Sequence, residues 1–91
     1  MSMDLHFPHC RSLKDKRSVL RPIVDGVDHR YPVAVAEVDH QDQWQRAQIG
    51  VAAVSGTPRQ VTDILDEVER FVWSRPDVEV GLVERTWMEV E

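Results

Sequence analysis

Basic side chains gather in one short stretch near the start of the chain, where they could bind an anion. Residues 11–21 hold five cations against a single acid, Asp15, which gives a local charge of +4. Ser12 and Asp15 have the spacing of a helix N-cap with an approximate capping box. Free N–H groups at a helix start can join nearby cations around a phosphate. The five cations are Arg11, Lys14, Lys16, Arg17 and Arg21.

The positions of these cations on the expected helix divide them into two groups. Three recur at intervals of three and four residues, so they share an outer face and are the better ligand candidates: Lys14, Arg17 and Arg21. Lys16 projects on the apolar side, and we expect it to reach an acid at a strand end, such as Glu37 or Asp39. A merely solvated helix face is the alternative for the outer group.

A polar segment in the middle of the chain is the second candidate site. His40, Gln41, Trp44 and Arg46 offer hydrogen-bonding groups, a cation and an aromatic ring on which a base could stack. The competing interpretation is a hairpin tip whose side chains bond their own backbone. With the cations of residues 11–21, these four complete the expected set of nucleic-acid or anion-binding residues.

The residues that could support catalysis or metal binding form no recognisable pattern. The spacing of the histidines and Cys10 matches no strong zinc motif. His40 lies beside Asp39 and Asp42, but neither a nucleophile nor a pocket can be identified for them. We therefore expect a protein that is not an enzyme and that uses no metal and no cofactor.

Composition and charge limit the class of protein. A chain of 91 residues with 42% hydrophobic residues suits one domain with its own core. Its single cysteine cannot form an internal disulfide, and no apolar run approaches the roughly 18 residues of a membrane span, so we expect a cytoplasmic protein without a membrane partner. The net charge of −5 leaves −9 outside residues 11–21, which argues against indiscriminate nucleic-acid binding.

The elements that must position these residues centre on a hairpin. Residues 33–55 contain two runs of Val, Ile and Ala around a polar centre, which predicts two strands and a turn. Before it, residues 3–7 alternate as a strand with Leu5 and Phe7 inward, and residues 13–30 carry a helical apolar stripe. Pro22 lies opposite that stripe, so we expect a kink or a break between Ser18 and Pro22.

The second half of the chain completes the fold. Thr57 can cap a helix over residues 58–74, and residues 78–90 are expected to form a last strand. The order β-α-β-β-α-β predicts an α+β ferredoxin-like two-layer sandwich, with an antiparallel four-stranded sheet and both helices on one face. The expected core comprises Leu20, Val24, Val27, Ile49, Val51, Ile64, Leu65 and Val68.

This architecture leaves one face of the sheet uncovered. If Ala47, Ile49, Val51 and Ala53 face the helices, Trp44, Arg46 and Gln48 face away. In the last strand, Val78, Val80 and Leu82 are expected to point inward and Val83, Arg85 and Trp87 outward, unless a bulge reverses the parity. Such a face invites a base or another protein.

Two segments at the expected separation resemble the YlxP-like family. They are Cys10–Ser18, Cys-Arg-Ser-Leu-Lys-Asp-Lys-Arg-Ser, and Ala36–Ala47, Ala-Glu-Val-Asp-His-Gln-Asp-Gln-Trp-Gln-Arg-Ala. The resemblance covers nearly the whole chain and implies a single ferredoxin-like domain over residues 1–91 without established enzymatic activity. The family's genes commonly lie beside those for transcription termination, translation initiation and ribosome-binding factor A, which implies a role near the ribosome or its RNA.

The sequence departs from the family pattern near its start. Family members usually have several more strand residues, Val-Gly-x-Leu-x, before the position of Asp4, and His9 replaces a residue that is usually small. Either the start of the sequence is trimmed or a partner chain fills the gap. A short first strand would leave part of the hydrogen-bond ladder of its neighbouring strands unpaired, and unpaired strand edges recruit other chains. We therefore expect a homodimer.

Two hypotheses of function follow. The first is an accessory module that binds RNA or a ribosomal particle through the cations and the hairpin. The second is an interaction or self-association module that uses the open sheet face or an edge strand. A metabolite-sensing module is a third possibility.

Overall fold

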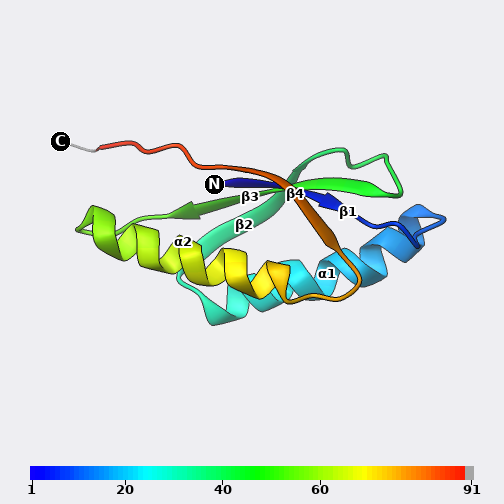
Figure 1. The fold of residues 1–91 in the computed structure, drawn as a ribbon, viewed down its shortest axis with the longest axis horizontal. Coiled ribbons are helices and arrows are strands. Elements are labelled where there is room, and N and C mark those ends of the chain that lie inside the picture. Colours follow the sequence, from blue (N-terminus) through cyan, green and yellow to red (C-terminus); the bar gives the residue numbers. More distant parts are fainter. Residues whose placement is uncertain (90–91) are drawn as a thin grey trace.

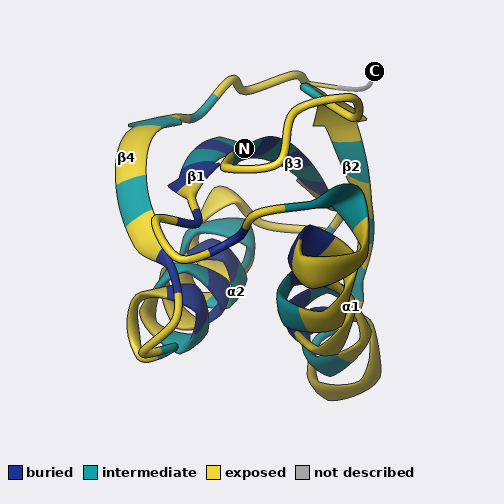
Figure 2. Ribbon diagram, turned by 90° about the vertical axis from the view of Figure 1, so that its right-hand side faces the viewer, coloured by how far each residue is buried: buried dark blue, intermediate teal, exposed yellow. Residues whose placement is uncertain are grey.

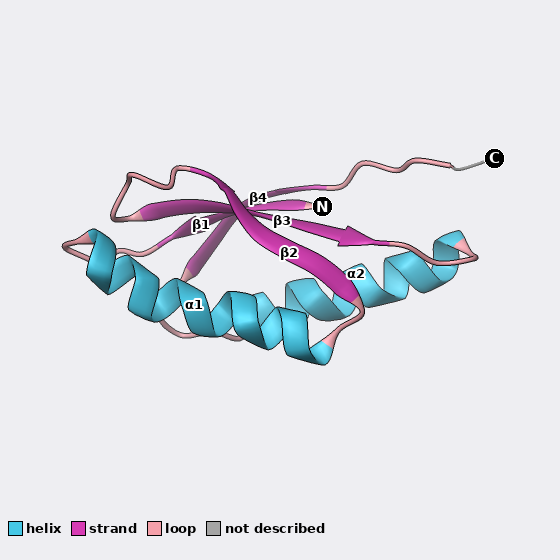
Figure 3. Cartoon of the chain, turned by 180° about the vertical axis from the view of Figure 1, so that it is seen from behind, coloured by secondary structure: helices cyan, strands magenta, loops and turns pink. Residues whose placement is uncertain are grey.

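The shortest strand lies at the centre of the sheet. The computed structural model describes residues 1–89, and its elements are β1 (Ser2–His6), α1 (Leu13–Arg30), β2 (Val33–Asp39), β3 (Arg46–Ala53), α2 (Pro58–Trp73) and β4 (Glu79–Glu84) (Figure 1). The strands follow the order β2-β3-β1-β4 and every neighbouring pair is antiparallel. Both helices lie on one side of the sheet (Figures 2 and 3), which confirms the ferredoxin-like fold.

Alternation along the strands and the helical stripes build one core between the two layers. Met3, Leu5 and Phe7 are fully buried on one side of the first strand. Their neighbours come from β3 and from both helices: Ala47, Ile49, Val51, Leu20, Ile23, Val27, Leu65, Val68 and Val72. Val24 and Ile64 pack against this cluster while partly buried, so the predicted core is confirmed.

The pairing of β1 fills most of the gap expected beside it. Its residues pair with β3 from Ser2 to His6, and with β4 over the same span. Met1 continues the ladder, because it exchanges two hydrogen bonds of 2.8 Å with Val51. On the side of β3 that faces β1, the residues of β3 left without a pairing partner are therefore Ala52 and Ala53.

Of the kink or break expected between Ser18 and Pro22, the break is wrong, because α1 runs continuously from Leu13 to Arg30. The pyrrolidine ring removes the one N–H that would bond the carbonyl of Ser18. Both residues are exposed on the outer side of the helix, where water can satisfy that carbonyl. The helix start agrees with the prediction, since the Oγ of Ser12 accepts a hydrogen bond of 3.0 Å from the N–H of Asp15.

The last strand differs from the prediction in both its parity and its length. Met3 pairs with Val83 whereas Leu5 pairs with Val80, so β4 carries one extra residue in a bulge. Leu82 is consequently 61% exposed, and Val83 packs against the core. Regular pairing stops at Glu84 rather than continuing as expected; Val90 lies outside the described residues.

The bulge also turns Arg85 toward the helices instead of away from them. Its guanidinium lies 2.9 Å from the carboxylate of Asp66 and 3.3 Å from that of Glu69, both on α2. The predicted outward orientation of Arg85 is therefore wrong. These ion pairs tie the end of β4 to the middle of α2.

The two helices approach each other where Gly26 meets Phe71. A Cβ atom added at Gly26 would lie only 2.7 Å from Cζ of the phenylalanine ring. That ring is already confined, because Tyr31 packs against it edge-on and the guanidinium groups of Arg30 and Arg75 lie over it at 4.8 and 5.6 Å. Glycine is therefore required here by the closeness of α1 and α2.

We expect Gly26→Leu to lower the free energy of unfolding by about 1–3 kcal/mol, because the side chain overpacks the interface between the helices. Urea unfolding followed by circular dichroism measures the change. Asp28→Leu is the control, since Asp28 is exposed on the same helix. Equal unfolding midpoints for the two variants would contradict this account of the contact.

Candidate functional site

The ammonium group of Lys16 is the centre of the region that holds the candidate residues. Lys16 is only 1% exposed, and its Nζ lies 2.9 Å from a carboxylate oxygen of Glu37. It also donates to the backbone carbonyls of His40, Gln41 and Arg46 at 3.0, 3.3 and 3.2 Å. Four acceptors thus surround a group that has three hydrogens to donate. The predicted pairing of Lys16 with an acid at a strand end is confirmed, with Glu37 as the acid.

These contacts fix the β2–β3 turn against the start of α1. Gln45 adds a second attachment. Its side-chain amide donates to the backbone carbonyl of Cys10 at 3.1 Å, and its backbone carbonyl accepts a hydrogen bond from the N–H of Phe7 at 2.9 Å. Within the turn, His40 has a φ of 63°. Its N–H bonds the carboxylate of Asp39 at 2.7 Å, which helps to hold this left-handed conformation.

The remaining cations are exposed: Lys14, Arg17 and Arg21 on α1, and Arg11 just before its N-cap Ser12. We call these four residues together the α1 cation face. Within residues 1–89, none of the four side chains belongs to an ion pair. Two residues of helix rotate the chain by about 200°, so Lys14 points nearly opposite to the buried Lys16. The members of this face that belong to α1 therefore lie on the outside of the helix layer.

The structure separates the predicted site residues into distinct regions. Lys16 cannot contact an external phosphate because its ammonium is buried and satisfied, which corrects its place in the anion-binding set. His40 and Gln41 lie in the anchored turn. Trp44 is 54% exposed in a surface depression that the turn forms with Asp42, Gln43 and Gln45.

Arg46 belongs to a third region, the open face of the sheet. Its guanidinium lies 3.7 Å from the carboxylate of Asp4 on β1, and its buried Nε has no hydrogen-bond partner among the described residues. Ala47 and Ile49 are fully buried on the helix side, as predicted, so Arg46 and Gln48 face away from the helices.

The thiol and the histidines do not assemble into a reactive centre in the part of the chain described. Cys10 is buried, and burial raises the pKa of its thiol above the ordinary value, with Asp15 and Asp77 raising it further and Lys16 opposing them. A protonated thiol is a poor nucleophile. Residues 1–89 contain no group of three or more His, Cys, Asp or Glu side chains arranged to hold a metal ion.

One surface feature was missed at the sequence level. Met1, Ala34, Ala36, Gly50 and Ala52 line an apolar groove on the open sheet face. The signal was present in β2, whose Val-Ala-Val-Ala run places valine on the helix side and alanine on the open side.

Comparison with known proteins shows the family of this chain. Residues 1–85 match the family described as "Protein of unknown function (DUF503)", and the chain belongs to that family. A relative, the "Uncharacterized protein YlxP" of Bacillus subtilis strain 168, is 38% identical over 76 residues, which cover 84% of this chain and 83% of the relative. The YlxP-like resemblance is thereby confirmed. No helix within residues 1–89 is long and apolar enough to cross a membrane.

We expect Lys16→Met to lower the free energy of unfolding by about 3 kcal/mol, because the methionine keeps the stem but leaves Glu37 and three carbonyls without their donor. Lys14→Met, on the exposed outer face, should change it by less than about 0.5 kcal/mol. Urea unfolding of both variants provides the comparison. The assignment of Lys16 as the anchor fails if both variants unfold at the same midpoint.

Proposed function

We propose that this protein is a non-enzymatic RNA-binding accessory factor whose α1 cation face holds phosphate groups. The observation that supports the proposal is the exposure of Arg11, Lys14, Arg17 and Arg21 without an ion-pair partner among the described residues. Cations that are not neutralised by the protein itself can replace the counterions of a nucleic-acid backbone.

The shape and the charge of the molecule favour one kind of RNA contact. A helix face presents no groove that could enclose a base, so its cations suit the phosphates of structured RNA, including ribosomal particles. The rest of the chain carries −9, because residues 11–21 contribute +4 to a net charge of −5. The rest of the chain is acidic overall and would repel RNA, so approach through the α1 cation face is favoured and binding should be oriented.

The anchored turn gives the α1 cation face a neighbour that could contact a base. Lys16 attaches the carbonyls of His40 and Gln41 to α1, and Trp44 follows in the same turn. An exposed indole on this turn could stack on an unpaired base of the same RNA. Because the buried Cys10 is a free thiol, a reducing cytoplasm is the compartment that we propose.

A second candidate function is favoured by a different observation. The apolar groove on the open sheet face suits a protein partner rather than an anion. In that case the protein would be an interaction or self-association module.

The double variant Lys14→Ala with Arg17→Ala tests the first candidate. If the α1 cation face binds phosphates, co-sedimentation with ribosomal subunits should weaken, and the salt slope of binding to a labelled RNA hairpin should fall by about two units. Trp44→Ala should weaken binding by about 1–3 kcal/mol if the indole stacks on a base.

The matched control removes two exposed cations from α2, through Arg59→Ala with Arg70→Ala. Both double variants change the net charge equally, so only a local site distinguishes them. If the α1 and α2 variants bind ribosomal subunits as tightly as the wild type, RNA binding by the α1 cation face is excluded and the interaction module takes its place.

A further inference from the structure

Two glutamines of the β2–β3 turn have their side-chain nitrogens engaged within the protein. Nε2 of Gln45 donates to the backbone carbonyls of Pro8 and Cys10 at 3.4 and 3.1 Å, and Nε2 of Gln43 lies 3.2 Å from the ring Nδ1 of His40. Both glutamines also line the surface depression of this turn. With the nitrogens engaged, it is the amide oxygens that remain to accept hydrogen bonds from a ligand in the depression.

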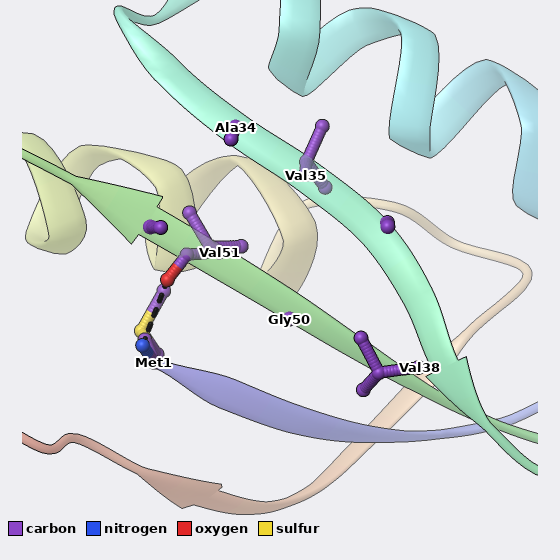
Figure 4. Close-up of a pocket in the computed structure, with 8 residues that line it drawn as sticks. Met1, Ala34, Val35, Val38, Gly50 and Val51 are labelled. Carbon is purple, nitrogen blue, oxygen red and sulfur yellow. Dashed lines mark hydrogen bonds between the residues drawn. The ribbon is translucent and has the colours of Figure 1, made fainter.

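Asp42 and Trp44 add a charge and a flat ring to the same depression. Asp42 is exposed and belongs to no ion pair within residues 1–89, and more than half of Trp44 is exposed. The groove on the open sheet face, drawn in Figure 4, has apolar lining side chains and offers no comparable set of acceptors. The depression therefore suits a planar ligand that stacks on the indole and carries N–H donors along one edge.

The charge beside the depression decides between two ligands of this kind. The guanidinium group of a protein partner could stack on an indole and pair with a carboxylate. However, the hydrogen bond from Gln45 to Cys10 places the depression beside Arg11, and the turn lies against the start of α1 (Figures 1 and 3). The α1 cation face repels a guanidinium and attracts a phosphate, so a nucleotide is complementary to both parts of this corner.

We propose that the depression holds an unpaired guanine of an RNA, stacked on Trp44 and read by the carboxylate of Asp42. This proposal rests on the proposed function, because the same RNA provides the phosphates for the α1 cation face. Unstacked RNA bases are recognised by aromatic stacking and by hydrogen bonds to their edges. On its Watson–Crick edge guanine presents two adjacent donors, N1–H and the N2 amino group, which match the two oxygens of one carboxylate.

The other three bases present a mixed edge at this position. Adenine and cytosine have an amino group next to an unprotonated ring nitrogen, and uracil has one N–H between two carbonyls. Each would place an acceptor against an oxygen of Asp42, and the engaged nitrogens of Gln43 and Gln45 offer no donor in compensation. The depression should therefore discriminate against all three.

Labelled RNA hairpins that differ at one bulged nucleotide test the identity of the base. We expect the wild type to bind a bulged guanosine about tenfold more tightly than a bulged adenosine or a fully paired stem. Bulged inosine, which lacks the N2 amino group, should lose most of this preference. Asp42→Asn should abolish the preference without weakening the binding of the paired stem, because the charge that it removes is negative. Asp63→Asn, at an exposed acid of α2, is the matched control and should keep the preference.

The outcomes separate this proposal from the proposed function. Equal binding of all the hairpins by the wild type would overturn the guanine site, and so would a preference for guanosine that survives in Asp42→Asn. Lys14→Ala with Arg17→Ala should weaken every hairpin by the same factor and keep the preference. If this double variant binds like the wild type while the preference persists, the phosphate contacts of the α1 cation face fail and the guanine site stands.

A nuclear magnetic resonance titration with guanosine monophosphate gives a readout that needs no RNA. The indole N–H signal of Trp44 and the side-chain amide signals of Gln43 should shift, and adenosine monophosphate should shift them less. The indole signals of Trp73 and Trp87, which lie outside the turn, should stay in place. Shifts at Trp44 with N-acetyl-arginine amide but not with guanosine monophosphate would assign the depression to a protein ligand and overturn the proposal.

Discussion

The buried ammonium of Lys16 is the interaction on which the arrangement of the molecule depends. Taking a charged group out of water costs several kcal/mol, and only close partners offset this cost. Lys16 has them because the start of α1, the end of β2, the turn and the start of β3 meet at its Nζ, where Glu37 and three carbonyls accept its hydrogens. One side chain thus sets the position of the turn relative to the helix, and with it the position of Trp44 relative to the α1 cation face.

The inward direction of Lys16 also explains why the neighbouring cation Lys14 is exposed. Helical geometry lets Lys16 point inward only if Lys14 points outward, since two residues rotate the chain by more than half a turn. The acids Asp39 and Asp42 lie near the turn, whereas the exposed Lys14, Arg17 and Arg21 cluster on the outside of α1. The molecule consequently has a cationic helix face on one side and an apolar open sheet face on the other.

Much of the fold could be predicted because its signals are local and periodic. The caps at Ser12 and Thr57 and the stripes of both helices set the elements, and the position of Lys16 on the apolar side indicated its acidic partner. The sequence leaves a bulge in the last strand open, but its presence and position in β4 could not be predicted, because the extra residue depends on pairing with Met3 and Leu5, which are about eighty residues distant along the chain. Its consequence was the wrong orientation assigned to Leu82, Val83 and Arg85.

The site was less predictable than the fold for a related reason. The cations of residues 11–21 were visible in the sequence, but which of them is buried depends on the strands that cover the helix. The break at Pro22 was wrong because tertiary packing of α1 outweighs one lost hydrogen bond on its solvent side. The groove on the open sheet face could not be predicted, because alanine and glycine have no polar or reactive groups. Their effect is the space that their small side chains leave open.

Amide hydrogen exchange in Lys16→Met tests the role of this anchor most directly. The N–H of Gln43 donates to the carbonyl of His40 within the turn, and the N–H of Phe7, just after β1, donates to the backbone carbonyl of Gln45 at the end of the turn. Val68→Ala in the core serves as the control, because it lowers the global stability without touching the turn. If Lys16 holds the turn, both amides should lose more protection from exchange in Lys16→Met than in this control. Protection that falls only as much as in Val68→Ala would show that the turn is held without Lys16 and would contradict the account.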